Sequence, residues 1–326
     1  MARLSSRRTG NPGRRGRALS RIAVAALAAA LVGTTAGAAH ADPAPRPSRD
    51  SVIEAQAELQ AKAKAKAAQD TSRAATSRAA AGAAAVFQPL FGLSGPELHY
   101  YEPDWLGGYQ PGVFENDTWG FSKTVTQTDH NADGYADGLW EITMDGHLFY
   151  QDSLTEPFHV GGGWNIYNRV FSPGNLAGAQ GYDLLARDGA GVLWIYLGYE
   201  TGTVTARTRV GAGWGEYTQI AGTGDISGDG RADIVARDGS GVLWLYQGTG
   251  SYSAPFKSRV KIGAGWNTYN NLVGAGDLDV DGIADLVARG NDGTLWRYSG
   301  NANPAAPYKK PVKIGTGGWN KFRSLF

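Results

Sequence analysis

The chain has 326 residues, with 31 lysines and arginines, 30 aspartates and glutamates, and no cysteine, which excludes disulfide bonds. Residues 1–41 hold seven arginines and no acidic residue, so the remaining chain has 24 basic and 30 acidic residues, a net charge of about −6. This acidic balance argues against nucleic acid as a partner, because nucleic-acid binding depends on a basic surface.

Residues 1–41 have the features of a secretory signal peptide. A basic front precedes Ile22–Val32, an apolar run of eleven residues that is too short to span a bilayer, and Ala39-His40-Ala41 offers a cleavage site. Arg7-Arg8 is compatible with twin-arginine export, but the residues after it are not apolar, so the export route stays open. A disordered basic tail is the alternative. We expect a secreted, extracellular protein without a membrane span.

Residues 42–84 are predicted to be a spacer or propeptide. Three prolines open this region, and an alanine-rich run with three lysines follows, almost without large apolar residues. Alanine and lysine favour helix, but nothing in this region could pack as a core. A membrane-active basic helix is the alternative, and the lack of an apolar stripe argues against it.

Residues 85–326 contain an internal repeat. Segments 116–151, 161–198, 211–248 and 263–300 can be aligned, and their tryptophans continue in a fifth copy near residue 319. The spacings are 45, 50, 52 and 53 residues between Trp119, Trp164, Trp214, Trp266 and Trp319. Each unit has four short apolar stretches separated by glycine and aspartate turns, which predicts four strands. The third stretch is apolar on both pleat faces, which is typical of a strand buried between sheets.

Four-stranded units that recur about every 50 residues predict an all-β fold, a β-propeller. The last copy stops after its first strand, whereas residues 85–114 resemble the second, third and fourth strands of a unit. We therefore predict five blades, the last of which is shared by the N- and C-terminal segments. Closing the ring removes open sheet edges, so we expect a monomer.

Three loops between the first and second predicted strands carry oxygen-bearing residues at positions one, three, five and nine. A glycine follows at position six, and position seven would offer its backbone carbonyl. The candidate ligands are Asp129, Asn131, Asp133, Tyr135 and Asp137 in the first loop, Asp225, Ser227, Asp229, Arg231 and Asp233 in the second, and Asp277, Asp279, Asp281, Ile283 and Asp285 in the third. Such hard oxygen donors suit calcium.

These loops are not EF-hands. Position twelve, which needs a bidentate carboxylate in an EF-hand, is Ala236 or Ala288, and the flanking segments are predicted strands. Solvated Asx-turn loops without an ion are the alternative. The corresponding segment 175–183 has Ala177 and Ala179 at ligand positions, so we expect that unit to lack the metal.

The sequences "GDISGDGRADIVARD" and "GDLDVDGIADLVARG" resemble the FG-GAP or VCBS-type repeat, a calcium-loop propeller unit that is also found in integrin α-chains. A second resemblance, of "KIGTGGWNKFRSLF", is to the tachylectins, five-bladed propellers that bind N-acetylated sugars between blades. This resemblance implies sugar sites at the glycine-tryptophan turns. An asparagine follows the tryptophan in three of these turns, whereas Gly215 follows Trp214. The implied ligand-binding residues are Trp164, Asn165, Trp214, Trp266, Asn267, Trp319 and Asn320.

The sequence offers no catalytic constellation. A zinc or catalytic site would need a spacing that the histidines do not show, and a nucleophile elbow is missing. We therefore interpret these histidines as surface or packing residues: His99, His130, His147 and His159. The tryptophans Trp194, Trp244 and Trp296 are expected in the core between blades. Those of the glycine-tryptophan turns could lie in the core or face a ligand.

The function predicted from these features is a secreted, calcium-stabilised, non-catalytic β-propeller that binds extracellular or cell-wall glycan. The first alternative is an integrin-like propeller that binds a secreted or cell-surface protein. The second is a secreted hydrolase, because the geometry of a carboxylate pair cannot be read from the sequence.

Overall fold

The structure is a computed structural model that describes residues 87–326, apart from 137, 153–156, 179–180 and 223. The predicted signal peptide (1–41) and the predicted spacer (42–84) lie outside the described residues. Within the described part of the chain, no helix is long and apolar enough to cross a membrane.

The described strands form five antiparallel sheets of four strands, which we number as blades 1 to 5. Blade 1 contains β20 (Ser324–Leu325), β1 (Leu90–Ser94), β2 (Glu97–Tyr101) and β3 (Val113–Asn116). Blade 2 contains β4 (Ser122–Thr128), β5 (Gly138–Thr143), β6 (Leu148–Asp152) and β7 (Phe158–Gly161). Blade 3 contains β8 (Tyr167–Gly174), β9 (Asp183–Asp188), β10 (Leu193–Tyr196) and β11 (Thr208–Gly211).

The two remaining blades follow the same order. Blade 4 contains β12 (Tyr217–Ala221), β13 (Ile234–Asp238), β14 (Leu243–Tyr246) and β15 (Val260–Gly263). Blade 5 contains β16 (Tyr269–Gly276), β17 (Asp285–Gly290), β18 (Leu295–Tyr298) and β19 (Val312–Gly315). A short 3₁₀ helix precedes the first strand of each blade; these are η1 (Trp119–Phe121), η2 (Trp164–Ile166), η3 (Trp214–Glu216), η4 (Trp266–Thr268) and η5 (Trp319–Lys321).

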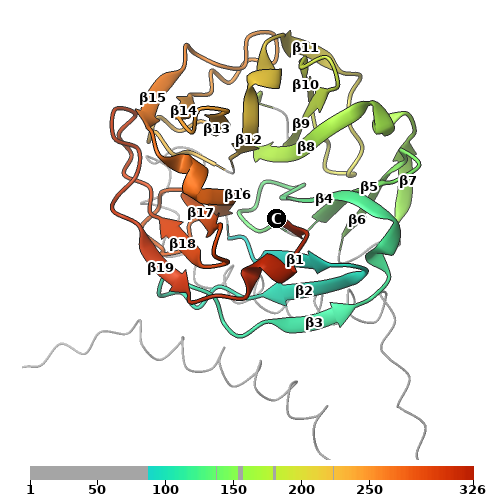
Figure 1. The fold of residues 1–326 in the computed structure, drawn as a ribbon. Helices are drawn as coiled ribbons and strands as arrows, with labels where there is room; N and C mark the ends of the chain where they lie inside the picture. Colours follow the sequence, from blue (N-terminus) through green and yellow to red (C-terminus); the bar gives the residue numbers. More distant parts are fainter. Residues whose placement is uncertain (1–86, 137, 153–156, 179–180, 223) are drawn as a thin grey trace, which may run out of the picture. The chain divides into compact units, whose positions relative to one another are not determined.

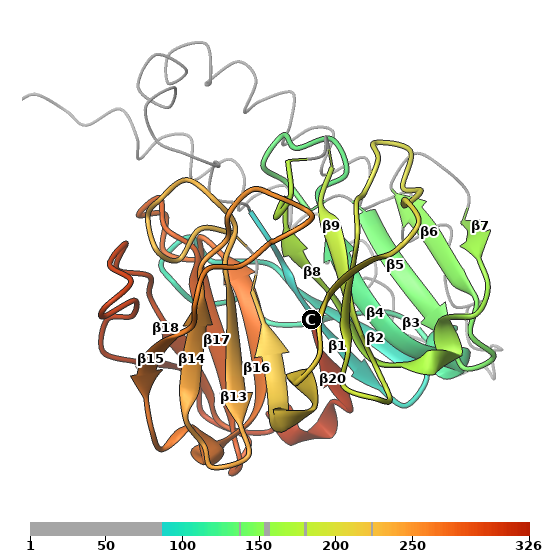
Figure 2. The same ribbon diagram turned by 90° about the horizontal axis from the view of Figure 1, so that it is seen from above.

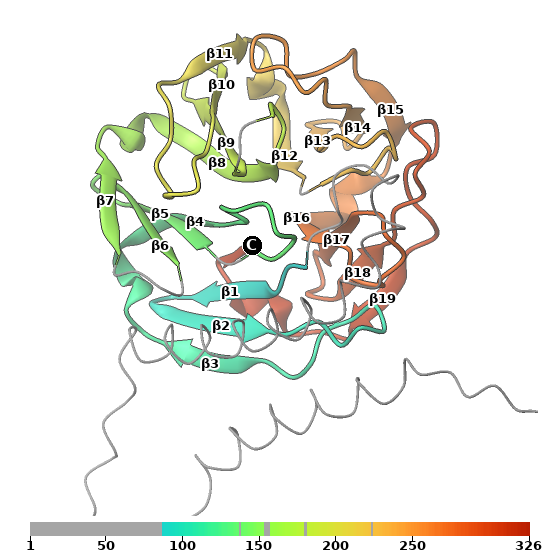
Figure 3. The ribbon, with the colours of Figure 1, turned by 180° about the vertical axis from the view of Figure 1, so that it is seen from behind.

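The blades surround a common centre, so the predicted all-β, five-bladed propeller is confirmed. The strands β4, β8, β12 and β16 lie near the centre, and β3, β7, β11, β15 and β19 lie at the rim (Figure 1). The same order is seen from behind (Figure 3). The carboxyl end of the chain lies near the centre of the ring.

Blade 1 is shared between the two ends of the described chain, as the sequence predicted. Its innermost strand is β20, which pairs with β1 through Gly92 and Leu325. Two reciprocal backbone hydrogen bonds, of 2.8 and 3.0 Å, join Phe91 and Phe326. Gly92 must be a glycine, because a Cβ there would lie 2.6 Å from the ring of Phe322. The Phe322 ring, which lies just before β20 in the sequence, therefore packs against the backbone of β1 at Gly92.

Buried side chains of the described residues form five clusters, and each cluster joins two neighbouring blades. In one of them, Leu243 and Leu245 of blade 4 pack with Trp266, Leu272 and Leu286 of blade 5. The cluster between blades 5 and 1 includes Leu295 and Leu325, which extends the core across the closure. The core of the fold is thus a series of interfaces between sheets, as expected for third strands that are apolar on both faces.

A basic side chain holds the 3₁₀ turn of the next blade at each of the five interfaces. It donates hydrogen bonds to two backbone carbonyls of that turn. The donor and the two acceptors are Arg187 with Trp214 and Tyr217, Arg237 with Trp266 and Tyr269, Arg289 with Trp319 and Phe322, Arg323 with Trp119 and Ser122, and Lys123 with Asn165 and Tyr167. Arginines of the second strand serve three interfaces, and residues of the first-strand segment serve the other two.

The connections divide into two faces of the ring (Figure 2). The 3₁₀ turns and the hairpins between second and third strands lie on one face. The loops between first and second strands lie on the other, together with the loops between third and fourth strands. This arrangement places all the predicted calcium loops on a single face.

Candidate functional site

The three predicted calcium loops share one backbone conformation. The carboxylate at position one accepts backbone hydrogen bonds from positions five and six, as Asp277 does from Asp281 (3.0 Å) and Gly282 (2.9 Å). The glycine at position six has φ of 93°, 85° and 94° at Gly134, Gly230 and Gly282. Position four is also left-handed, although it is alanine or valine in two of the loops: Ala132, Gly228 and Val280 have φ of 57°, 79° and 63°.

The aspartate at position nine is buried and binds backbone from two directions. In blade 4, one carboxylate oxygen of Asp233 accepts the amide hydrogen of Ser227 (2.8 Å), and the other accepts that of Gly248 (2.8 Å). Asp285 has the same contacts with Leu278 and Gly300. Burial raises the pKa of Asp233 to about 6 and that of Asp285 to about 7. The corresponding Asp137 of blade 2 lies outside the described residues.

Three aspartates lie close together in the loop of blade 5. Carboxylate oxygens of Asp277, Asp279 and Asp285 lie within 4.8 Å of one another. Among the described residues, this is the one cluster of three acidic or histidine side chains that is close enough to hold a metal ion. One oxygen of Asp279 is buried without a hydrogen-bond partner, while the other accepts a hydrogen bond from Ser299 (2.8 Å) and pairs with Arg297 (3.3 Å). Three hard oxygen donors with one of them unsatisfied fit a calcium ion.

The aspartate at position five is paired with a lysine of the next loop. Asp281 contacts the Lys309 ammonium at 2.5 Å, and Asp229 contacts that of Lys257 at 2.8 Å. These lysines were not among the residues predicted from the sequence. The two lysines occupy equivalent places in the repeat, because Lys309 follows Tyr308 and Lys257 follows Phe256. Aligning the two copies through these aromatic residues could have identified the lysines from the sequence. The segment at 175–183 lacks both the aspartate and a corresponding lysine.

The tryptophans of the glycine-tryptophan turns are buried. Trp164, Trp214 and Trp266 are exposed by 7 % or less, and Trp319 is half-buried. Each indole packs on a tyrosine of the third strand of its own blade, with ring centroids 4.6–4.7 Å apart. Trp164, Trp214 and Trp266 therefore belong to the core between blades, and Trp319 packs against that core.

The neighbouring asparagines lie beside a different element. Asn165, Asn267 and Asn320 pack against the hairpin glycines of the preceding blade, Gly146, Gly241 and Gly293. The amide of Asn320 also donates to the Asn291 carbonyl at 2.9 Å. In one turn, the tryptophan thus contacts a tyrosine of its own blade, whereas the asparagine contacts the hairpin of the preceding blade.

The expectation that Trp194, Trp244 and Trp296 are core residues is only partly correct. All three are half-buried, and a cation lies over each ring. The guanidinium groups of Arg207 and Arg259 lie 4.2 Å from the ring centroids of Trp194 and Trp244, respectively. The Lys313 ammonium lies 4.9 Å from the ring centroid of Trp296. The indole nitrogen of Trp244 donates to Asp238 at 2.8 Å in the adjacent turn. This hydrogen bond holds the polar edge of the indole near the surface.

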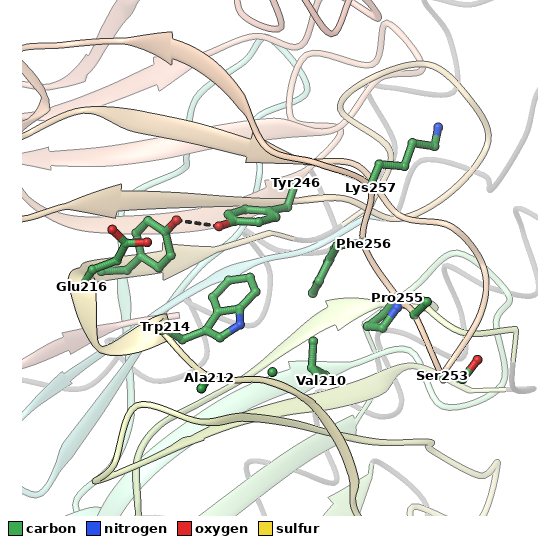
Figure 4. A pocket seen from close by; sticks show the side chains of 13 residues that line it. Val210, Ala212, Trp214, Glu216, Tyr246, Ser253, Pro255, Phe256 and Lys257 are labelled. Carbon is green, nitrogen blue, oxygen red and sulfur yellow. Dashed lines mark hydrogen bonds between the residues drawn. The ribbon is translucent and has the colours of Figure 1, made fainter.

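A pocket of about 420 Å³ opens beside Trp214. Trp214, Tyr246 and Phe256 supply aromatic surface, and the main chain of 210–213 forms one side (Figure 4). The loop 253–257 forms the opposite side and contributes Ser253 and Lys257. The sequence analysis included Trp214 among the ligand residues but missed this loop, because the loop lies about 40 residues further along the chain.

The repeat carries a family match. Residues 225–288 match the FG-GAP-like repeat. The match begins at the first aspartate of the blade 4 loop and includes the whole loop of blade 5, so the resemblance predicted from these loops is confirmed. No curated protein sequence matches the chain.

Solved structures with a similar fold come from several sources. The BP39L lectin from Burkholderia pseudomallei has 14 % identity over 72 % of this chain and 72 % of its own, with a TM-score of 0.44. AofleA from Arthrobotrys oligospora has 10 % identity over 73 % and 89 %, with a TM-score of 0.39. Prp20p from Saccharomyces cerevisiae has 11 % identity over 70 % and 62 %, with a TM-score of 0.35. Similarities this low carry no argument about function.

Proposed function

We propose that the chain is a secreted, calcium-stabilised β-propeller that binds extracellular glycan and has no catalytic role. The observation that carries the glycan part is the pocket beside Trp214. Its volume of about 420 Å³ lies within the range of about 300–1,000 Å³ that is usual for small-molecule sites. Aromatic edges can contact the apolar face of a pyranose, while the Ser253 hydroxyl and backbone groups can bond hydroxyl or acetamide groups.

Calcium is proposed for the FG-GAP-like loops because of their donor set and their charge. The pKa of Asp277 is raised, first by burial and further by Asp281 and Asp279 nearby. A divalent cation would remove this repulsion and satisfy the unpartnered oxygen of Asp279. Asp277, Asp279, Asp281 and Asp285 with the Ile283 carbonyl would hold it in blade 5. The role of the ion would be to stabilise the loop face.

The glycan proposal is tested by blocking the pocket. Ala254→Arg places a long side chain at the pocket mouth, and Ala306→Arg at the equivalent place in blade 5 is the matched control, because both alanines are exposed. A glycan array first identifies a ligand, with N-acetylated sugars expected. Calorimetry then measures its binding, which Ala254→Arg should weaken at least about tenfold while Ala306→Arg leaves it unchanged.

Equal affinity in both arginine variants would remove the pocket from the glycan site. If the wild-type chain binds no glycan but captures a defined extracellular protein, the integrin-like alternative replaces the glycan proposal. The calcium proposal is independent of this outcome, because its readout is thermal stability.

A further inference from the structure

Two histidines of blade 2 that the sequence analysis treated as unrelated contact each other. Nδ1 of His147 lies 2.9 Å from Nε2 of His159. His147 lies in the turn between β5 and β6, and His159 lies in β7, opposite Phe149 of β6. Both imidazoles are exposed, so the pair is open to solvent.

The surroundings of His147 fix the backbone of its turn and place a carboxylate near one ring nitrogen. The Thr143 amide donates to the His147 carbonyl at 2.9 Å, and the His147 amide donates to the Thr143 hydroxyl at 3.1 Å, which closes the turn that carries the histidine. A carboxylate oxygen of Asp145 lies 4.0 Å from Nε2 of His147, and Asp145 itself accepts a hydrogen bond from the Thr143 hydroxyl at 2.5 Å. A nearby carboxylate favours the hydrogen on Nε2, which leaves the lone pair of Nδ1 directed toward His159.

The separation of the two nitrogens suits a metal ion. At a metal–nitrogen distance of about 2.0–2.1 Å, two ligands at a right angle lie about 2.9 Å apart, whereas two tetrahedral ligands lie about 3.3–3.4 Å apart. Right angles between neighbouring ligands are typical of square-planar or octahedral Cu²⁺ and Ni²⁺, and imidazole is a ligand that both ions accept. The observed 2.9 Å, which is also an ordinary hydrogen-bond length, is compatible with the right-angle geometry and shorter than the tetrahedral separation.

We propose that His147 and His159 form a two-imidazole site for a divalent transition-metal ion of the Ni²⁺ or Cu²⁺ type. Without metal, the hydrogen on Nε2 of His159 points to Nδ1 of His147. On binding, this hydrogen moves to Nδ1 of His159 through solvent, both facing nitrogens donate lone pairs, and water completes the coordination. Asp145 is a positioning residue that contacts His147 and not the metal. The site is separate from the oxygen ligands of the calcium loops.

Calorimetric titration of the full chain with NiCl₂, at a calcium concentration that fills the aspartate loops, tests the proposal. We expect His147→Gln and His159→Gln each to remove one equivalent of nickel binding. The control His130→Gln should retain it, and Asp145→Asn should weaken it by about tenfold, as is usual for a residue that orients a metal ligand. His147 and His159 are exposed, whereas His130 is half-buried against the ring of Tyr150, so equal melting temperatures of the variants are needed to establish that they are folded.

Nickel binding that stays unchanged in both His147→Gln and His159→Gln would overturn the proposal, as would a wild-type chain that binds no nickel. A second measurement is anomalous scattering from a nickel-soaked crystal. The proposal requires a peak between Nδ1 of His147 and Nε2 of His159, and peaks confined to the aspartate loops would contradict it.

Discussion

The aspartate at position nine has, in blades 3, 4 and 5, a structural role that does not require metal. Asp183 of blade 3 accepts hydrogen bonds from Leu176 and Ala177 at 2.9 Å and from Gly198 at 3.3 Å, the contacts that Asp233 makes in blade 4. Yet the blade 3 segment has no ligands at positions three and five. A carboxylate at position nine is therefore required by the turn itself, and only positions one, three and five distinguish a loop suited to calcium.

Calcium should raise the melting temperature, because an ion that binds only the folded chain stabilises it by mass action. At about 100 times its dissociation constant, each loop should add about 2.7 kcal/mol, or about 5–10 °C for a domain of this size. Asp279→Asn should remove about a third of the rise, if the three loops act independently. The control is Asp292→Asn in the hairpin of the same blade. Scanning calorimetry in calcium and in chelator measures the melting temperatures of both variants and of the wild type. If the wild type melts at the same temperature in calcium and in chelator, the loops do not bind calcium.

Stability without calcium should fall as the pH rises. Burial raises the pKa of Glu115 to about 7, above its ordinary value of 4.5. A folded-state pKa above the unfolded one favours the protonated folded chain, so this contribution is full below about pH 4.5 and lost through pH 7. Glu115 should contribute on the order of 2–3 kcal/mol of this loss, and Glu115→Gln should remove that share while the shares of Asp233 and Asp285 remain; exposed Glu200→Gln should leave the loss unchanged. Urea unfolding in the presence of chelator measures the free energy of unfolding at pH 5 and at pH 8. If this free energy changes equally with pH in the wild type and in Glu115→Gln, the prediction is wrong.

At the scale of elements, the five interfaces use one hydrogen-bonding pattern with two different donors. Where the second strand carries arginine, the first strand carries a small acceptor: the Nε hydrogen of Arg187 is donated to Asn168 and that of Arg237 to Thr218. Blades 1 and 2 lack this arginine, and there Arg323 and Lys123 of the first-strand segment donate to the same kind of turn. The cation changes strand, and its acceptors stay within the 3₁₀ turn, although Lys123 bonds the carbonyl of Asn165 where the arginines bond that of the tryptophan.

Arg237→Met should therefore destabilise the propeller. It keeps much of the volume but leaves the carbonyls of Trp266 and Tyr269 without their donor, at a cost of about 1–3 kcal/mol for each buried group that stays unpaired. Arg209→Met is the matched control, because Arg209 is exposed. Chemical denaturation measures the difference, and identical midpoints for the two variants would show that the arginine contributes only charge to the surface.

The elements were predictable from the sequence, and part of the candidate site was not. Strands such as β13 and β14 follow from their apolar runs and from the glycine turns that every copy repeats. The side of the pocket formed by 253–257 could not be found in this way, since it depends on how a loop folds back across Trp214. The contact of His147 with His159 depends on the register between β6 and β7, which no spacing rule for metal ligands reports.

At the scale of the whole molecule, the closure of blade 1 makes the ring a single cooperative structure. Deleting residues 317–326 should remove β20, the Arg323 contacts and the aromatic packing of Phe322 and Phe326, and should expose the inner edge of β1. We expect aggregation or failure to fold. Deleting residues 42–80 should be tolerated, because their composition offers no core. Gel filtration and circular dichroism of the two truncations test this, and a folded, monomeric chain without 317–326 would contradict it.

The pairing of β1 with a strand so distant in sequence also determines the order of events during synthesis. Arg323 bonds the carbonyl of Gly95, 228 residues earlier in the chain. At about 5–20 residues per second, a ribosome needs about 10–50 s to make the intervening segment. Throughout that interval the hairpin of β1 and β2 has been made but lacks its inner neighbour. The nascent chain is therefore open to strand exchange with another copy, and a helper that shields this edge would act before β20 emerges.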